Sequence, residues 1–185
     1  MKPGGISIKL LLALSLMVAI QSTRAQGLFT SDELKNMSFK ERIYYGGMLG
    51  AGFGTITSVQ VAPVVGYRIL PRWSAGVGAQ YQFFQDNRPP SYNTHVYGGN
   101  IHSRVFILEN IFAHAEIEVL SFEGWDRTQD FKFHRMTVPH LFIGAGYFMP
   151  AGRRSGLALT VLYDLVQDLN SPYIGNYVIR MGFIF

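Results

Sequence analysis

The chain has 185 residues, of which 48% are hydrophobic, 16 are basic and 12 are acidic. It contains no cysteine, which excludes disulfides, thiolate metal ligands and cysteine catalysis. Three basic residues, Lys2, Lys9 and Arg24, precede the expected mature chain, so 13 basic residues face 12 acidic ones there, a net charge of about +1 that does not favour nucleic acid as a partner.

The first 25 residues have the pattern of a secretory signal peptide. Lys2 and Lys9 flank or precede an apolar run from Leu10 to Ile20, which is too short to span a bilayer. Thr23-Arg24-Ala25 offers a cleavage site before Gln26, and no cysteine follows for a lipid anchor. The sequence therefore predicts an exported protein that begins near Gln26.

Residues 26–42 are polar and poor in strand signals. Thr30 and Glu33 have the spacing of a capping box, which predicts a short helix from Ser31 to about Lys40. We expect a periplasmic lead-in that packs beneath the following domain or is partly disordered. The alternative is an interfacial helix that places Leu34 and Met37 among lipid headgroups.

From Ile43 onward, apolar and polar residues alternate with a period of two. Segments of roughly 10 to 13 residues have the length of tilted membrane-spanning strands. They are Ile43 to Gly54, Ser58 to Leu70, Arg72 to Phe84, Val96 to Leu108, Ile111 to Phe122, Met136 to Phe148, Ser155 to Val166 and Tyr173 to Phe185. This pattern predicts an all-β fold, an eight-stranded antiparallel up-and-down β-barrel over residues 43–185.

The two faces of these segments differ in chemistry. Odd-numbered positions are mainly apolar or aromatic and carry no charge, as in Val59, Tyr67, Ile101, Leu141 and Phe183. Even-numbered positions hold the polar residues and many glycines; they include Gln80, Gln82, His102, Arg104, His114, Glu116, Glu118, His140, Thr160, Asp164, Asn176 and Arg180. Each strand therefore has one apolar face and one polar face.

Alternation alone does not say which face lies inside, because a soluble lipocalin-like barrel would turn its apolar face inward. Three features favour the inverted arrangement of a membrane barrel. Glycines suit a crowded lumen, aromatic residues gather near strand ends, and short connections alternate with long ones. Short turns at 70–72, 108–110 and 149–154 belong on the periplasmic side, and long loops at 85–95 and 123–135 lie outside, so both termini are expected in the periplasm.

The signal peptide, the eight alternating segments and the final Phe185 resemble the small outer-membrane barrels of Gram-negative bacteria, the OmpA/OmpX-like group. The hairpin Val64-Val65-Gly66-Tyr67-Arg68 followed by Pro71-Arg72-Trp73-Ser74-Ala75-Gly76-Val77-Gly78-Ala79-Gln80-Tyr81 is similar to hairpins of this superfamily. The resemblance implies a location in the cell outer membrane, with its lipids and lipopolysaccharide as neighbours. It also implies that the assembly machinery recognises the terminal strand ending in Phe185.

Inward charges on neighbouring strands predict ion pairs within the lumen. If one hairpin turns about Asn110, Arg104 lies opposite Glu116 and His102 lies opposite Glu118. If the last hairpin turns about Pro172, Asp164 lies opposite Arg180. An eight-stranded lumen is filled by side chains, so these pairs are expected to neutralise its charges.

Catalysis requires a nucleophile and a base within hydrogen-bonding reach. His102 and Ser103 are neighbours in a strand and point to opposite faces, and His140 has no serine beside it in phase. His102, His114 and His140 also lack the spacing of metal ligands. We therefore predict no catalytic residue, no metal and no cofactor.

The segment between the fifth and sixth strands combines aromatic residues with charges of both signs. It supplies candidates for contact with lipopolysaccharide, a partner protein or a host surface: Trp125, Arg127, Phe131, Lys132, Phe133 and Arg135. The alternative is that its aromatic residues only extend the girdle and the strand ends. The sequence thus predicts a structural or surface-interaction role without enzymatic activity, the alternatives being a lipid A-modifying enzyme (acyl transfer or deacylation) and a narrow pore.

Overall fold

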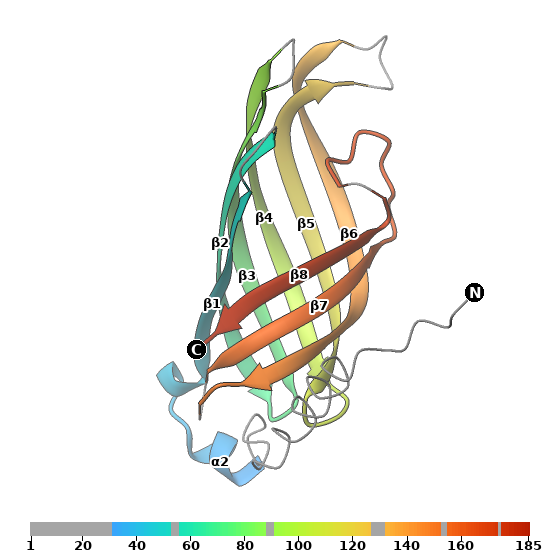
Figure 1. Ribbon diagram of the computed structural model, residues 1–185. Coiled ribbons are helices and arrows are strands. Elements are labelled where there is room, and N and C mark those ends of the chain that lie inside the picture. The colour runs from blue at the N-terminus through green and yellow to red at the C-terminus, as the bar shows by residue number, and fades with distance from the viewer. Residues whose placement is uncertain (1–30, 53–55, 88–90, 127–131, 153–154, 174) are drawn as a thin grey trace, which may run out of the picture.

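The computed structural model describes residues 31–52, 56–87, 91–126, 132–152, 155–173 and 175–185. The predicted signal peptide and its cleavage site lie outside these residues, as does Thr30 of the predicted capping box. Eight antiparallel strands, each paired with the next in the chain, form a closed barrel in which β8 returns to β1 (Figure 1). The predicted all-β, up-and-down architecture is confirmed.

The strands differ in length around the barrel. They are β1 (Ile43–Gly52), β2 (Ile56–Leu70), β3 (Trp73–Asp86), β4 (Tyr92–Phe106), β5 (Ile111–Trp125), β6 (Phe133–Pro150), β7 (Gly156–Asp164) and β8 (Tyr177–Ile184). β4 and β5 have 15 residues each and β6 has 18, whereas β7 has 9 and β8 has 8. The strands β4 to β6 therefore extend farther along the barrel than β7 and β8 do (Figure 1).

The two loops predicted to be long are shorter than expected because their flanking strands continue. Trp125 pairs with Phe133 at the end of the β5–β6 hairpin, and their rings meet edge to face with centroids 5.3 Å apart. Glu123 and Arg135 face each other in the same hairpin and form a 3.3 Å ion pair. Such cross-strand contacts stabilise a hairpin and extend it beyond the segments predicted from alternation.

The last strand begins at Tyr177, not at Tyr173 as predicted. The side chain of Tyr173 lies in the lumen, where its hydroxyl donates a 2.6 Å hydrogen bond to Glu118. This contact draws the chain away from the wall before β8 begins.

The lead-in contains a helix, α2 (Ser31–Asn36), which is shorter than the predicted one, and a 3₁₀ turn, η2 (Lys40–Arg42). Arg42 caps the helix end by donating a 2.8 Å hydrogen bond to the carbonyl of Leu34. Phe39 packs on Tyr67 of β2 with ring centroids 5.1 Å apart, so the segment lies against the base of the barrel (Figure 1). No helix among the described residues is long and apolar enough to cross a membrane.

The inside and outside of the barrel follow the parity of the sequence. Every buried residue within the described ranges has an even number, and the large apolar residues exposed within the strands have odd numbers, except Leu70 at the end of β2. The exterior is thus apolar, as predicted from the alternation.

The lumen also contains apolar residues that the predicted polar face did not include. One cluster, at the end with the long hairpins, holds Val96, Leu120, Phe122, Met136 and Val138. The other, at the base, holds Phe112, Phe148 and Ala158. Their even positions in the sequence could have indicated that they lie inside the barrel. The polar residues of the lumen therefore lie in a layer between two apolar layers.

One glycine shows why the lumen needs small residues. Gly66 of β2 stands opposite Tyr44 of β1, and the ring of Tyr44 lies over it. A Cβ atom at Gly66 would overlap this ring. The glycine lets a large aromatic side chain lie across the sheet and reach the centre of the barrel.

Candidate functional site

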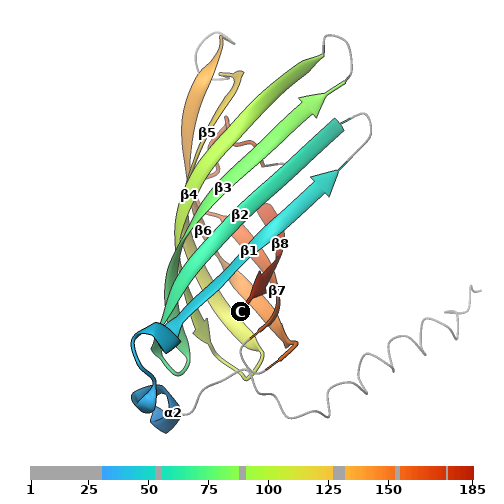
Figure 2. The same cartoon turned by 90° about the vertical axis from the view of Figure 1, so that its left-hand side faces the viewer.

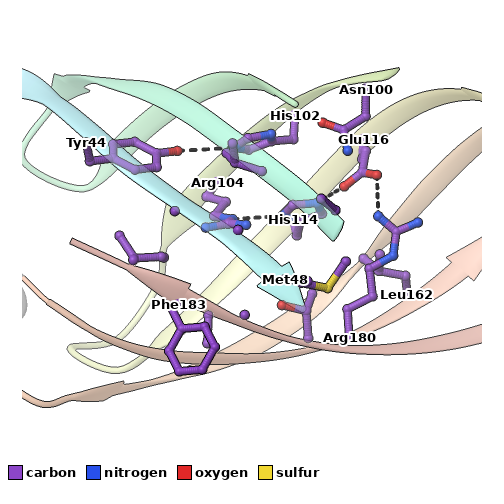
Figure 3. A pocket seen from close by; sticks show the side chains of 18 residues that line it. Tyr44, Met48, Asn100, His102, Arg104, His114, Glu116, Leu162, Arg180 and Phe183 are labelled. Atoms are coloured by element: carbon purple, nitrogen blue, oxygen red, sulfur yellow. Dashed lines mark hydrogen bonds and ion pairs between the residues drawn. The ribbon is translucent and has the colours of Figure 1, made fainter. Parts of the chain in front are cut away.

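Polar side chains from several strands meet in the middle of the barrel, and Figure 3 shows the part nearest the base. We call this group the lumen network; it consists of Tyr44, His102, Arg104, His114, Glu116, Glu118, Tyr173 and Arg180. All but Tyr173 come from strands. The network reaches across the barrel, because Arg180 belongs to β8 and the two glutamates belong to β5.

Arg180 is the centre of the network. Its Nη1 donates a 2.5 Å hydrogen bond to Oε1 of Glu116. Its Nη2 lies 3.2 Å from both carboxylate oxygens of Glu118, whose side chain is completely buried. The guanidinium also lies over the ring of Phe142, 5.0 Å from its centroid. One cation thus contacts two buried carboxylates, which is a geometry that planar arginine suits better than lysine.

His114 connects Arg104 to this centre. Nε of Arg104 donates a 3.2 Å hydrogen bond to Nδ1 of His114. Because arginine has no acceptor, Nδ1 must be unprotonated, and the proton of neutral His114 lies on Nε2. Nε2 then donates the 2.9 Å hydrogen bond to Glu116 (Figure 3). The imidazole is held as one tautomer by its two neighbours.

Tyr44 and His102 form the end of the network nearest the base. The hydroxyl of Tyr44 lies 3.1 Å from Nε2 of His102, and the ring of His102 stacks on that of His114 with centroids 5.7 Å apart (Figure 3). Ser103 points outward, where its hydroxyl accepts a 2.9 Å hydrogen bond from Trp73. The predicted separation of His102 and Ser103 onto opposite faces is confirmed.

The residues predicted to form lumen ion pairs lie in the lumen, but their predicted partners are wrong. Asn176, predicted on the same polar face, is exposed just before β8. His102 stands opposite Glu116, and Arg104 stands opposite His114, so this hairpin is shifted by two residues. Thr160, not Asp164, stands opposite Arg180. Arg180 pairs with Glu116 and Glu118 instead, and Asp164 pairs with His140.

Tyr173 is a member of the network that the sequence did not reveal. It lies between β7 and β8, and it receives a 3.1 Å hydrogen bond from Arg180 while it donates to Glu118. Burial raises the pKa of the Tyr173 phenol, opposed by Arg180 and reinforced by Glu118. The phenol therefore remains a donor, and it fastens the β7–β8 connection inside the barrel.

His140 and Asp164 form a second buried pair above the network. Nδ1 of His140 lies 2.6 Å from Oδ2 of Asp164, and the other carboxylate oxygen accepts a 3.0 Å hydrogen bond from the backbone of Val166. The imidazole stacks on Phe142 with centroids 5.5 Å apart. Nε2 of His140 is buried and makes no hydrogen bond in the described part of the chain.

A cavity of about 50 Å³ lies beside the network near the base, between Tyr44, Arg104, Glu116 and Arg180 (Figure 3). This space holds no more than a few water molecules. The buried Oδ1 of Asn100 is on its wall and lacks a protein partner among the described residues. No group of three or more His, Asp or Glu side chains in the described ranges could hold a metal ion.

The predicted surface-contact residues divide into two groups. Trp125, Phe133 and Arg135 lie at the ends of β5 and β6, where both rings are exposed. Lys132 is exposed just before β6. Arg127 and Phe131 lie outside the described residues. Trp125 and Phe133 extend the strand ends, as the alternative interpretation expected, and their contact with lipopolysaccharide or a partner protein stays a prediction.

The polar side chains of the lumen bind mainly to one another. Its charges neutralise each other, its imidazoles have fixed partners, and its carboxylates share one guanidinium. Comparison with known proteins adds no identity to this geometry: no family model matches the chain, and no curated protein matches it.

Proposed function

We propose that the protein is an integral β-barrel of a bacterial outer membrane, with a structural or surface-interaction role and without catalysis of its own. The observation that carries the proposal is the apolar exterior of a closed barrel with an ion-paired interior. A barrel that faces water on its outside would place its charges there. A lipid-facing barrel needs apolar side chains on the exterior and all backbone groups paired within the wall.

The lumen supports a structural role over a pore. Arg180, Glu116 and Glu118 reach across the barrel between β8 and β5, and Tyr173 joins them. Eight strands leave an interior that side chains can fill. On this proposal the termini lie in the periplasm, Phe185 ends the strand read by the assembly machinery, and the exposed strand ends near Trp125 meet lipopolysaccharide or a partner protein.

The exterior provides the sharpest test. Ile101 is exposed near the middle of β4, and its replacement by arginine should lower the free energy of unfolding in phosphatidylcholine bilayers by about 2–4 kcal/mol. Phe133→Arg, at the strand end, is the matched control and should lower it by about 0–1 kcal/mol. Urea titration of refolded protein measures both. A barrel that faces water would tolerate arginine at exposed Ile101, and equal small effects would therefore refute the proposal.

Location and orientation are checked in cells. The wild-type protein should fractionate with outer membranes and migrate differently on gels before and after boiling. Trypsin added to intact cells should cut the β5–β6 connection after Arg127 or Lys132. Cleavage confined to the β6–β7 connection, at Arg153 or Arg154, would reverse the proposed orientation.

The second candidate is a lipid A-modifying enzyme, and the His140–Asp164 pair is the observation that favours it. A carboxylate that orients an imidazole through Nδ1 leaves Nε2 free to act as a base. Here Nε2 is enclosed, and no serine or threonine hydroxyl is bonded to it among the described residues. Mass spectrometry of lipid A from cells that overproduce wild-type protein or His140→Gln tests this candidate. A lipid A change that requires His140 would establish catalysis.

A further inference from the structure

The barrel closes through the shortest of its strand pairings. β1 and β8 pair at Gly46 with Ile184 and at Gly47 with Phe183. Beside these, the backbones of Tyr45 and Phe185 exchange hydrogen bonds of 2.9 and 2.8 Å. The paired part lies at the lower end of β1, next to the C-terminus (Figure 2). Within the described strands, residues 48–52 of β1 and 177–182 of β8 do not pair with each other, although both pair on their other sides.

A cavity of about 420 Å³ lies at this unpaired part of the wall. We call the cavity and its opening between the two strands the slit. Leu49, Gly50, Ile179 and Met181 line it from the two strand edges. A Cβ atom built on Gly50 would meet only the side chain of Gln60 on β2, at 3.6 Å, and would meet nothing from β8 within 4 Å. The two edges therefore stand apart. The volume lies within the range of about 300–1,000 Å³ that is usual for small-molecule sites.

The rim of the slit is apolar and faces outward. Leu49 is 72% exposed, Ile179 is 71% exposed and Met181 is 61% exposed, which places them among the most exposed large apolar side chains of the wall. These residues lie on two strand edges that no neighbouring strand covers. A hydrocarbon chain is the chemical complement of such a rim.

The inner wall of the slit is polar, and its one charged residue is already paired with carboxylates. Gln60, Gln80 and Gln82 line it, and Gln60 stands directly opposite Gln82 in the β2–β3 pair. Their amides have no protein hydrogen-bond partner among the described residues. Arg180 also reaches this wall, but its guanidinium is already bound by two carboxylates.

The unpaired backbone adds a second requirement. N–H and C=O groups at membrane depth must be satisfied by polar partners, because hydrocarbon offers none. At the slit, β1 and β8 do not supply these partners to each other, so water or another occupant of the cavity has to supply them. An occupant with hydrogen-bonding groups at one end can satisfy the glutamine amides and the backbone groups nearest to them.

We propose that the slit is a lateral binding site for an acyl-chain amphiphile with an uncharged, hydrogen-bonding head, which enters from the surrounding lipid. Its chain lies against Leu49, Ile179 and Met181, and its head reaches the amides of the lumen. A neutral head fits because Arg180 is already bound by Glu116 and Glu118, and Arg104 near Glu116 supplies the second positive charge. This site rests on the proposed membrane location, which supplies the amphiphile.

The test uses a photoactivatable monoacylglycerol with full-length protein refolded in phosphatidylcholine bilayers. Labelled peptides should come from residues 48–50 and 178–181, and unlabelled monoacylglycerol should remove this labelling. Lysophosphatidylglycerol of the same chain length carries a charged head and should fail to compete. Labelling spread evenly over all eight strands, or equal competition by the charged amphiphile, would overturn the proposed site.

Variants separate the slit from ordinary lipid contact. Gly50→Phe places a ring in the cavity, on the side of Gln60, and should abolish labelling at the slit. Gly99→Phe is the matched control, because Gly99 is exposed on the exterior of β4 and a Cβ atom there meets its nearest neighbour at an ordinary 3.4 Å. If Gly50→Phe does not fold, Gln82→Leu decides: it should weaken competition by monoacylglycerol, and unchanged competition would overturn the role of the amides.

Heat-dependent migration and recovery in the membrane are recorded separately from labelling. Inserted protein with even labelling would refute the slit and leave the membrane location intact. Protein that stays in solution yet labels at the slit in detergent would support the slit and refute the location.

Discussion

Tyr173 and Glu118, 55 residues apart in the chain, are joined inside the lumen by a 2.6 Å hydrogen bond. Glu118 is fully buried, and Tyr173 is the one residue of the lumen network, as defined above, that a connection rather than a strand supplies. The bond therefore ties the β7–β8 connection to the far side of the barrel.

Removing the hydroxyl of Tyr173 should loosen this connection. Tyr173→Phe leaves a buried carboxylate oxygen with one donor fewer, and we expect the free energy of unfolding to fall by about 1–3 kcal/mol. Tyr177→Phe changes an exposed ring on the exterior and should have almost no effect. Urea unfolding in detergent measures both variants, and equal effects would show that the hydrogen bond does not stabilise the barrel.

Arg180 should be the most sensitive charge of the lumen. Arg180→Met leaves Glu116 and Glu118 buried without their cation, which should lower stability by about 3–5 kcal/mol. Adding Glu116→Gln and Glu118→Gln should recover much of this loss, because no carboxylate then remains unpaired.

The matched control is Arg135→Met. Arg135 pairs with Glu123 at 3.3 Å, but their side chains are 40% and 43% exposed, and such pairs contribute about 1 kcal/mol or less. A similar loss for Arg180→Met and Arg135→Met would mean that water reaches the lumen network freely.

The His140–Asp164 pair should behave as a buried polar unit. Asp164→Leu leaves Nδ1 of His140 without an acceptor and should cost about 1–3 kcal/mol in stability. Asp164→Asn keeps an acceptor oxygen and should cost less. His140→Phe combined with Asp164→Leu should recover part of the loss, since Phe142 already stacks on the imidazole. Full recovery is not expected, because Val166 loses its acceptor in either case.

The backbone and side chain of Phe185 should have separable effects. Deleting Phe185 removes both hydrogen bonds to Tyr45 and should lower stability in refolded protein by roughly 1–3 kcal/mol. Phe185→Ala keeps these bonds and loses an exposed ring, so its stability in vitro should be nearly unchanged. If the assembly machinery reads the ring, Phe185→Ala should still lower the amount assembled in cells. Equal stability of both variants would argue against the closing role of the backbone.

The parity of the sequence predicted more of this fold than its turns did. Alternation assigned odd residues such as Ile101 to the exterior and even residues such as Glu116 to the interior, and both assignments are confirmed. Burial enforces parity, because a shift by one residue would turn every side chain to the other face.

The sequence predicts which residues pair across two strands less well than it predicts which face they lie on, because the pairing depends on turn geometry. The β4–β5 hairpin pairs Phe106 with Phe112, so its centre is Glu109 and not Asn110 as predicted. Moving a turn centre by one residue slides the strands by two and keeps parity, which is why Arg104 remained in the lumen but changed its partner. In the last hairpin, the larger slide follows from the turn of Tyr173 into the lumen, a tertiary contact that no local pattern records.

The short seam between β1 and β8 also has a consequence for how the barrel forms. Seven strand pairs join neighbours in the chain, whereas the seam brings its two ends together across the whole sequence. The entropy lost in closing a chain segment grows with its length, so hairpins can form early and the seam is expected to form last. It is also held by the fewest bonds. The pairing of β1 with β8 would then be the last step of barrel closure. Its separation would be the first step of opening toward the lipid.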